Sequence, residues 1–307
     1  PDAWDTVLKR FGGDHERVEL LAAAGLVIPR DTGGHYDRFR GRVMFPIRDA
    51  RGRTVGFGGR VIGDGEPKYL NSPETVLFHK GRELYGRYEA RQKLRDIVRL
   101  VVVEGYMDVV GLARNGIRFS VATLGTATTG DHLDRLFRLT NEVVFSFDGD
   151  RAGRKAAWRA LENALPKITD GRALRFAFMP DGQDPDSLVA NEGSSAFERV
   201  LDAALPLSDF MIGELTAQVD AESAEGRAQL AELARPLVAK LPDGVYRELV
   251  IDALAEAVSL GPAKLRSMLG DAPAARRRGA RQARRSTGQR ATPMRRALTL
   301  LLHEPAA

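Results

Sequence analysis

The central part of the chain alternates between short apolar runs and longer segments in which apolar residues recur at helical spacing. Runs rich in β-branched and other apolar residues predict buried strands. The strands expected here are 100–103, 119–123, 143–147 and 173–179, and the helices between them are 108–115, 131–139 and 152–165. Strands that alternate with helices of about ten residues indicate crossover connections and a mainly parallel sheet.

The segments on either side of this section have other patterns. Toward the N-terminus, short helices are expected within 1–30, strands at 43–47 and 54–60, and an Arg-rich helix at 84–97. From 197 to 269 the apolar spacing is helical throughout. The expected fold class is therefore α/β, with an α+β N-terminal subdomain, a central parallel-type βαβ sheet and a C-terminal helical subdomain.

These patterns divide the chain into five sections. An N-terminal mixed α/β basic subdomain (1–97) precedes the central sheet domain (98–190) and a helical subdomain (191–270). Residues 271–292 are rich in Ala, Arg, Gly, Ser and Thr and poor in apolar residues, which predicts a disordered basic linker. The final section, 293–307, has the pattern of the first turns of a helix that would open a further domain.

Acidic residues follow three of the expected strands at the point where each should end. In open α/β sheets, ligands bind just outside the carboxyl ends of the strands. Asp148 and Asp150 are two positions apart in extended chain, so both side chains point the same way. Like charges held that close repel unless a cation lies between them, which predicts a divalent-metal site. The residues expected to converge there are Glu104, Asp108, Asp148, Asp150, Asp184 and Asp186.

Two local alternatives remain open for these carboxylates. Either Glu104 or Asp108 could instead cap the helix that begins beside it, and the sequence from Asp181 to Asp186 could form a surface turn. If a metal is bound, oxygen ligands without nearby His or Cys favour magnesium or manganese over zinc. Two such ions can stabilise both the attacking and the leaving oxygen in phosphodiester chemistry. The site therefore predicts phosphoryl or nucleotidyl transfer, or the reverse hydrolysis.

Composition and charge narrow the range of functions. The chain of 307 residues contains no cysteine, which excludes disulfides, thiolate catalysis and cysteine-bound zinc. It has no apolar run of membrane length and no signal-peptide pattern, so an intracellular protein is expected. Because it begins with Pro1 rather than Met, a fragment of a longer protein is also expected.

Basic residues are concentrated in two stretches of the chain. The formal net charge is +5 with a pI near 9.6. Between Arg38 and Lys93 there are thirteen Lys and Arg against six Asp and Glu, and 273–296 holds nine Arg and no acid. Such an excess favours a polyanion such as nucleic acid, although a solvated surface is the alternative.

Within the first basic stretch, three segments have the composition of phosphate or nucleotide contacts. Gly56–Arg60 could let the backbone approach a phosphate, and Lys68 to Asn71 combines a cation, an aromatic ring and an amide. Phe78–Arg82 adds further cations. Taken singly, each of these segments is equally compatible with an ordinary turn or loop.

Taken together, the motifs resemble a known family. Glu104–Asp108, Asp148–Gly153 and Asp184–Asp186 resemble the TOPRIM domain shared by primases, topoisomerases and some nucleases. The upstream segments resemble the DnaG-type bacterial primase alone, and the resemblance covers residues 1–270 as the RNA polymerase core of such a primase. These upstream segments are Tyr36–Ile47, Val55–Arg60, Pro67–Thr75 and Phe78–Gly81.

The resemblance implies DNA-templated synthesis of short RNA primers, by metal-dependent nucleotidyl transfer from ribonucleoside triphosphates on single-stranded DNA. It assigns catalysis to Glu104, Asp148 and Asp150, and binding of two or more Mg²⁺ or Mn²⁺ ions to all six carboxylates. The implied nucleotide-binding residues are Arg38, Lys68, Tyr69, Asn71 and Lys80. The implied DNA-binding residues are Arg40, Arg42, Arg60 and Lys68.

The resemblance also implies partners and a location. The family carries an N-terminal module whose cysteines bind zinc, and zinc is expected only there because this chain has no cysteine. It carries a C-terminal helicase-binding domain, of which 293–307 would be the remaining stub. The replicative helicase and single-strand-binding protein are the expected primosome partners, with no membrane contact and a cytoplasmic location at the nucleoid and replication fork.

Three other functions compete with this interpretation. A topoisomerase would share the acidic sheet but needs a tyrosine nucleophile in an additional large domain. A TOPRIM nuclease would keep the metal site without the nucleotide-binding loops. A non-enzymatic single-strand-binding scaffold with Arg-rich tails would need neither the metal site nor the nucleotide-binding loops.

Overall fold

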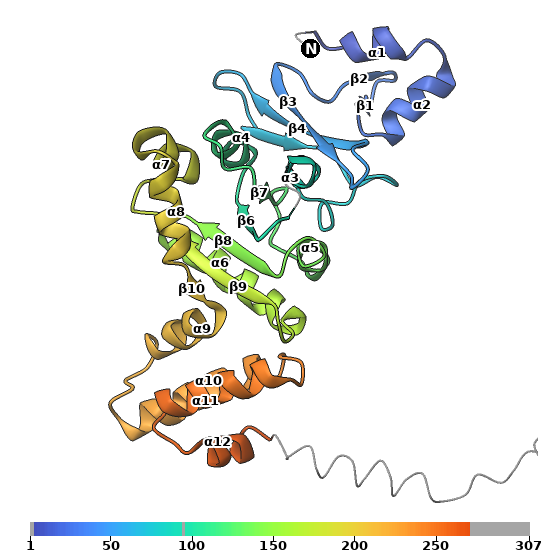
Figure 1. Cartoon of the computed structure of the whole chain (residues 1–307). Coiled ribbons are helices and arrows are strands. Elements are labelled where there is room, and N and C mark those ends of the chain that lie inside the picture. Colours follow the sequence, from blue (N-terminus) through green and yellow to red (C-terminus); the bar gives the residue numbers. More distant parts are fainter. Residues whose placement is uncertain (1–2, 94–95, 271–307) are drawn as a thin grey trace, which may run out of the picture. The chain divides into compact units, whose positions relative to one another are not determined.

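The computed structural model of the chain describes residues 3–93 and 96–270 (Figure 1). The chain divides into two compact units, Pro1–Val258 and Ser259–Ala307. The second unit is described only as far as helix α12 (Pro262–Met268) and the two residues after it. The predicted linker at 271–292 and the predicted domain stub at 293–307 lie outside the described residues. No helix in the described part of the chain is long and apolar enough to cross a bilayer.

The N-terminal part begins with two short helices and a two-stranded ribbon. Helices α1 (Thr6–Phe11) and α2 (His15–Ala23) confirm the helices expected within 1–30. Strands β1 (Val27–Pro29) and β2 (His35–Asp37) then pair antiparallel, which the sequence did not predict. Asp37 is fully buried and accepts hydrogen bonds from the backbone N–H groups of Val7 and Leu8, at 2.7 and 3.0 Å. This carboxylate therefore satisfies donors in the first turn of α1 that have no partner inside the helix.

A three-stranded antiparallel sheet follows. Strands β3 (Arg42–Arg48) and β4 (Thr54–Val61) confirm the two strands predicted at 43–47 and 54–60, and they pair antiparallel as a hairpin. Asp49 in the turn of this hairpin accepts hydrogen bonds from two backbone N–H groups. Strand β5 (Tyr69–Asn71) completes the sheet beside β4, where the sequence suggested only a loop. Helix α3 (Arg87–Lys93) begins three residues later than the expected 84–97 helix, and residues 94–95 beyond it are not described.

The central sheet has the strand order β10-β9-β8-β6-β7, in which β10 is the two-residue edge strand Leu205–Pro206. Its parallel strands are β6 (Arg99–Val103), β7 (Ser120–Ala122), β8 (Glu142–Phe147) and β9 (Ala173–Phe178). The helices between them are α4 (Tyr106–Arg114), α5 (Gly130–Leu136) and α6 (Arg151–Ala164), the last continued by a 3₁₀ turn, Leu165–Lys167. This arrangement confirms the predicted crossover units and parallel sheet.

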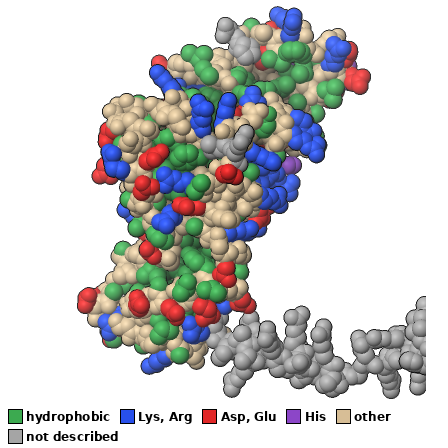
Figure 2. All heavy atoms as spheres, in the orientation of Figure 1, with side chains coloured by type: hydrophobic (Ala, Val, Ile, Leu, Met, Phe, Trp, Pro, Cys, Tyr) green, Lys and Arg blue, Asp and Glu red, His purple; other side chains and the backbone are tan. Residues whose placement is uncertain are grey.

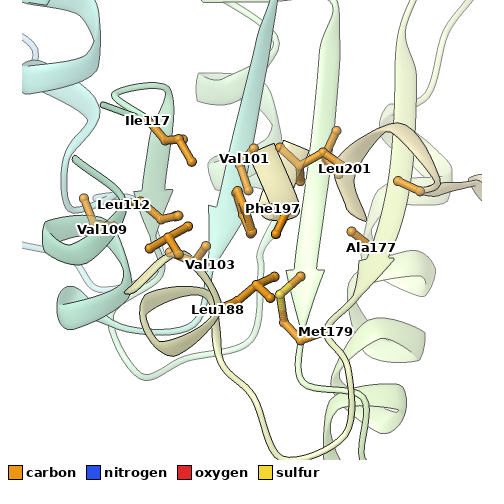
Figure 3. Packing of buried hydrophobic residues seen from close by; sticks show 14 of the residues in the cluster. Val101, Val103, Val109, Leu112, Ile117, Ala177, Met179, Leu188, Phe197 and Leu201 are labelled. Atoms are coloured by element: carbon orange, nitrogen blue, oxygen red, sulfur yellow. The ribbon is translucent and has the colours of Figure 1, made fainter. Parts of the chain in front are cut away.

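The sheet is buried on both faces. Helices α4, α7 (Pro185–Glu192) and α8 (Ser194–Asp202) cover one face, where Val101, Val103 and Phe197 are part of a continuous apolar cluster (Figure 3). Alternate side chains of the strands point to the other face, where the ring centroid of Phe176 lies 4.6 Å from that of Phe210 in α9 (Leu207–Thr216). Because successive side chains point to opposite faces, strands buried on both sides read as continuous apolar runs, and this made them recognisable in the sequence.

The C-terminal part of the first unit is helical, with one exception. Helices α9 (Leu207–Thr216), α10 (Ala224–Val238) and α11 (Val245–Ala257) confirm the predicted helical subdomain. Strand β10 (Leu205–Pro206) corrects the expectation of helix throughout 197–269, because it pairs antiparallel with β9 at the edge of the central sheet. A two-residue strand leaves no period-two pattern from which it could be predicted.

Candidate active site

The ends of neighbouring parallel strands bring the predicted carboxylates to one edge of the central sheet. Strand β6 ends at Val103 and is followed at once by Glu104, and β8 ends at Phe147 and is followed by Asp148. These strands are adjacent and parallel, so both side chains leave at the same edge. Asp108 lies in the first turn of α4, Asp150 is the N-cap of α6, and Asp184 and Asp186 open α7.

Three of these carboxylates also cap helices. The carboxylate of Asp108 accepts a hydrogen bond from the Gly105 N–H at 2.9 Å, that of Asp150 from Gly153 at 2.7 Å and that of Asp184 from Ser187 at 2.7 Å. The capping alternative is therefore realised at these positions, including Asp108. An ionised carboxylate offers about four lone-pair positions, so one capping bond leaves capacity for a cation.

The electrostatics of the site show that the carboxylates act on one another. Burial, followed by the charges of Asp184, Asp148 and Asp186, raises the pKa of Asp108 to about 7 against the pull of its capping bond. Burial and then the charges of Asp148 and Asp150 raise the pKa of Glu104. The pKa of Asp148 is raised by burial and by Asp150 and Asp184. Asp148 thus interacts with both halves of the acidic set.

This unrelieved repulsion fits a site for divalent cations. Oxygen donors without His or Cys suit magnesium or manganese, and a bound cation would stabilise the charged carboxylates against both the burial and the mutual repulsion that raise these pKa values. Within residues 3–93 and 96–270, no three His, Cys, Asp or Glu side chains already form a group that could hold a metal ion. The six carboxylates therefore lie along one edge of the sheet, but no three of them are arranged to coordinate one ion.

Two glycines allow the close packing of this edge. A Cβ at Gly153 would lie 2.1 Å from the carbonyl oxygen of Asp148, so only glycine lets the first turn of α6 approach the end of β8. A Cβ at Gly111 in α4 would lie 1.9 Å from Oδ1 and 3.0 Å from Cβ of Asp186 in α7. The position of Asp186 consequently depends on the absence of a side chain on α4.

The three-stranded sheet adjoins the acidic edge through Tyr106, the first residue of α4. Its ring stacks on Phe45 with the centroids 5.2 Å apart, and a Cβ at Gly58 would lie 2.5 Å from it. The Tyr106 hydroxyl donates to Oδ1 of Asn71 at 2.7 Å, and Nδ2 of Asn71 donates to the carbonyl of Leu124 at 2.9 Å. Asn71 therefore connects β5 both to α4 and to the loop that follows β7.

Some of the predicted basic and aromatic residues face this junction. Arg60 lies opposite Tyr69 in the β4–β5 ladder, and Gly58 lies opposite Asn71, so these residues share the face of the sheet that packs on Tyr106. Tyr69 is 39% exposed, with its ring 6.4 Å from that of Tyr106. Its exposure makes it an available stacking surface beside Tyr106, the first residue of α4.

Other predicted contacts are occupied within the N-terminal part. Arg42 lies on the opposite face of the sheet, and its guanidinium donates to the carbonyls of Gly59 and Lys68. Arg40 lies over the ring of Trp4 at 4.1 Å and donates to the carbonyl of Asp37. The structure therefore separates these two arginines from Tyr69 and Arg60.

The remaining cations are less engaged. Arg38 has a buried Nε without a hydrogen-bond partner among the described residues, and burial lowers the pKa of its guanidinium. Lys68 is exposed and Lys80 is half-buried, and the ammonium group of neither pairs with a described acid. The backbone of Lys80 is held in place, because its N–H donates to Glu74 and its carbonyl accepts from His132 Nε2.

The structure adds a cavity that the sequence analysis missed. It has a volume of about 370 Å³ and lies beside Glu104, with Thr126, Thr128 and Arg159 in its lining. Arg159 is exposed on α6 and forms no ion pair with a described residue. The strand pattern could have placed this cavity, because the loop after β7 follows another parallel strand and therefore lies at the same edge of the sheet. It was missed because the threonines of this loop carry no charge.

Comparison with known proteins identifies the family. The crystal structure of a DNA primase domain from Pseudomonas aeruginosa superposes with a TM-score of 0.85 at 53% sequence identity, covering 88% of this chain and 85% of that one. The chain belongs to the DnaG-type DNA primase family. A second solved structure, the DnaG primase catalytic domain bound to ssDNA, matches with a TM-score of 0.83 at 55% identity over 86% of this chain and 83% of that one.

Family models and a curated relative agree with this assignment. The model for the N-terminal domain of the DNA primase catalytic core matches residues 1–91, a Toprim-like model matches 101–189, and a model for the DnaB-helicase binding domain of primase matches 208–263. DNA primase of Escherichia coli K12 is 60% identical over 247 residues, which are 80% of this chain and 42% of that protein. The chain thus spans less than half the length of the curated relatives that it matches.

Proposed function

We propose that this chain is the RNA polymerase core of a bacterial replicative primase, which synthesises short RNA primers on single-stranded DNA. The observation that carries the proposal is the meeting of two neighbouring carboxylate-bearing strand ends with a face that presents Arg60 and Tyr69. A nuclease would need the acidic edge alone, whereas a polymerase must also hold a nucleotide beside it. The solved ssDNA complex of a relative supports DNA as the template strand.

In this proposal the 3′-hydroxyl of the growing primer attacks the α-phosphate of the next ribonucleotide. The hydroxyl gives up its proton to water, a P–O bond forms to the primer, and the bond between the α-phosphate and pyrophosphate breaks. Two or more Mg²⁺ or Mn²⁺ ions would supply activation of the attacking hydroxyl and neutralise the developing charge. Glu104, Asp148 and Asp150 would hold these ions directly at the reacting phosphate, with Asp108, Asp184 and Asp186 completing the ligand set.

The basic face would hold the substrates. Arg38, Lys68 and Lys80 would neutralise the triphosphate, and Tyr69 offers a ring on which a base can stack. Arg60 and Lys68 would contact the phosphates of the template. If Arg40 and Arg42 contact the template strand, their side chains must leave the partners that they have in this structure. If Asn71 contacts nucleotide, it must do so while keeping its two hydrogen bonds.

The domain division and partners form a further part of the proposal. We place the TOPRIM domain at 98–190, between the basic subdomain (1–97) and the helical subdomain (191–270). A helicase partner is supported by the match to the DnaB-binding model, which falls on α9–α11 rather than on 293–307, where the sequence analysis expected such a remnant. Single-strand-binding protein remains a prediction, as does a cytoplasmic location at the replication fork.

Primer synthesis can be tested directly. The protein is incubated with labelled single-stranded DNA, Mg²⁺ and ribonucleoside triphosphates, with and without a short complementary RNA that bypasses initiation. Template-dependent extension of that RNA supports the proposal. Shortening of the DNA instead would identify a nuclease, and binding without either reaction would identify a scaffold.

Replacing Gly111 with Ala is expected to impair the metal site without unfolding the protein. The new methyl group would displace Asp186, and a shift of this size at a reacting centre costs about ten- to a hundredfold in rate. The measurement is the Mg²⁺ dependence of primer extension, with thermal unfolding alongside. Gly213→Ala in α9 is the matched control, because nothing lies within 4 Å of a Cβ there and the helix should be stabilised by up to about 1 kcal/mol. Equal Mg²⁺ dependence in both variants would contradict the prediction.

Tyr106→Phe is expected to lower stability by about 1 kcal/mol, because it removes the hydroxyl that donates to Asn71. For a unit of this size that corresponds to a fall of roughly 2–4 °C in Tm. Tyr88→Phe, which loses a hydrogen bond from Gln92 on an exposed surface, should change Tm much less.

Comparing Asn71→Ala with Tyr106→Phe then separates the structural role of Asn71 from its proposed role in nucleotide binding. If Asn71 also contacts nucleotide, only its own replacement raises the KM for ribonucleoside triphosphates.

A further inference from the structure

A second basic site lies away from the carboxylates, between α3, α5 and the β3–β4 turn. It is a cavity of about 700 Å³, and its lining includes five cationic side chains. These are Arg87, Arg91, Lys93, Arg135 and Arg138. The cavity was not anticipated from the sequence, because its cations come from segments more than forty residues apart in the chain.

The charge of this basic pocket is far from balanced. Glu83 is the acid that pairs with its cations, at 3.0 Å from Arg135 and 3.7 Å from Arg87. Arg91 and Arg138 are exposed and form no ion pair with any described residue. Figure 2 shows Lys and Arg side chains gathered over the face of the molecule on which α3 and α5 lie. The pocket therefore has an excess of positive charge facing solvent.

One of its arginines is buried although it lacks a full set of partners. Arg87 is 9% exposed, and its Nε has no hydrogen-bond partner within the described residues. Burial is the largest cause that lowers the pKa of its guanidinium, and the charges of Arg135 and Arg91 add to it against the attraction of Glu83 and Asp49. Oε2 of Glu83 is likewise buried without a hydrogen-bond partner, but Arg91 and Arg138 leave the pocket with an excess of positive charge. Buried donors are normally satisfied, so the unpaired Nε in this excess of positive charge indicates a place for an anion.

The lining also indicates what kind of anion fits. Apart from the cations, the described lining residues are Gln92 and the aliphatic Ala50, Ile97 and Leu139, and none of these described residues offers an aromatic ring on which a base could stack. Phosphate groups spaced along a chain suit such a surface, whereas a free nucleotide would find nothing that recognises its base. Arg is also the side chain best suited to phosphate, because its planar fork can donate two parallel hydrogen bonds.

The position of the pocket relates it to the active site. Ile97 precedes β6 and Leu139 precedes β8, so the pocket lies at the amino ends of the strands whose carboxyl ends carry Glu104 and Asp148. The five residues of β6 separate the two edges by roughly 16 Å. A nucleic-acid strand of moderate length can therefore reach both places.

We propose that the basic pocket of Arg87, Arg91, Lys93, Arg135 and Arg138 binds the sugar-phosphate backbone of a nucleic-acid strand, as a second contact outside the active site. This inference rests on the proposed function, since it takes nucleic acid as the substrate class. The second contact adds affinity for long strands and leaves the chemistry at the carboxylates unchanged. The basic pocket contacts phosphate groups, so its binding is expected to have no sequence preference.

The experiment compares charge reversals at exposed positions. In Arg91→Glu/Arg138→Glu both unpaired cations of the pocket are reversed, and in the matched control Arg114→Glu/Arg199→Glu two exposed arginines on α4 and α8 are reversed instead. Binding of fluorescent single-stranded DNA of about 30 nucleotides and of about 6 nucleotides is measured by anisotropy over a range of salt concentrations. Arg91→Ala/Arg138→Ala provides a milder variant with the same expected direction should the reversals disturb folding.

The expected result is specific to the long strand. The pocket variant should bind it about tenfold more weakly than the control, with a salt slope smaller by about 1.4, since each lost phosphate contact lowers the slope by about 0.7. Binding of the short strand should match the control. Equal affinity of the pocket variant and the control variant for the long strand would overturn the inference. A pocket variant that no longer binds inorganic triphosphate but binds long DNA as the control does would also overturn it. If the wild-type protein extends primers and the variants bind alike, the inference fails while the proposed function stands.

Discussion

Asp148→Asn is expected to abolish primer extension while leaving the fold intact. Asp148 follows β8 and interacts electrostatically with Asp150, Asp184, Glu104 and Asp108, so its charge serves both halves of the acidic set. Stabilisation of the reacting phosphate by bound cations is worth several kcal/mol, and its loss corresponds to a rate reduction of about a thousandfold or more. The measurement is the rate of extension of a short RNA on a DNA template at saturating Mg²⁺.

The control is a carboxylate of the same neighbourhood that is outside the proposed ligand set. Asp181 is exposed in the loop after β9, and its Oδ1 would lie 3.3 Å from a Cβ at Gly149. Asp181→Asn removes one negative charge near the site and should retain most of the activity. Because a neutral amide in place of the Asp148 carboxylate relieves repulsion, the Asp148→Asn protein should melt no lower than the wild type in the absence of divalent ions. Extension at the wild-type rate by Asp148→Asn would refute the proposed mechanism.

His132→Ala is expected to cause a large loss of stability at a residue outside the acidic set. His132 is completely buried at the start of α5, where Nδ1 accepts from the Thr129 N–H at 3.2 Å and Nε2 donates to the Lys80 carbonyl at 2.9 Å. Replacing it leaves a cavity and two unpaired backbone groups, which together cost about 2–4 kcal/mol. A fall in Tm of roughly 5–12 °C is expected by calorimetry.

The same histidine predicts a pH dependence. Burial, and then the charge of Arg135, keep the pKa of His132 below its usual value against the hydrogen bonds to backbone carbonyls. The unfolded chain therefore binds a proton more readily than the folded one, so this contribution to stability is present above about pH 6.5 and is lost as the pH falls below it. His132→Ala should show a weaker loss of Tm between about pH 7 and 5.5 than the wild type. His15→Ala, at an exposed position in α2, should follow the wild type at every pH.

Loss of His132 has a further expected consequence, because its imidazole holds the backbone of Lys80. If the Lys80 side chain contacts the triphosphate, His132→Ala should raise the KM for ribonucleoside triphosphates in the surviving folded protein. An unchanged KM would place Lys80 outside the nucleotide site.

The sequence predicted those parts of the fold whose pattern is local and repeated. The strands at 100–103 and 143–147 were recognisable because burial on both faces makes them continuously apolar, and the carboxylates that follow them could be placed at one edge by the geometry of parallel strands. Strands β1, β2, β5 and β10 were missed because two or three residues carry no measurable period. Strand β7 is equally short but was recognised, because it lies within the largely apolar run 119–123 between two predicted helices.

The sequence predicted the strand or helix end on which a side chain lies better than it predicted the group to which that side chain bonds. Nothing local distinguishes Arg40 and Arg42, which bond within the N-terminal part, from Arg60, which faces the junction with α4. The helix-capping bonds of Asp150 and Asp184 were likewise not assigned, since a residue that can ligate a cation and one that can cap a helix have the same chemistry. The basic pocket lay beyond the reach of any pattern, because it is formed only when α3 and α5 come together.

The two hydrogen bonds of the Asn71 amide have a consequence for substrate selection. They join β5 to α4 and to the segment after β7, so the gap between Tyr69 and the acidic edge is set before any ligand arrives. Such preorganisation spares the entropy that loose side chains would lose on association. If Tyr69 stacks a base and the acidic edge holds the reacting phosphate, as proposed, a substrate whose base and reacting phosphate are separated by a different length would satisfy one end of this gap and not the other.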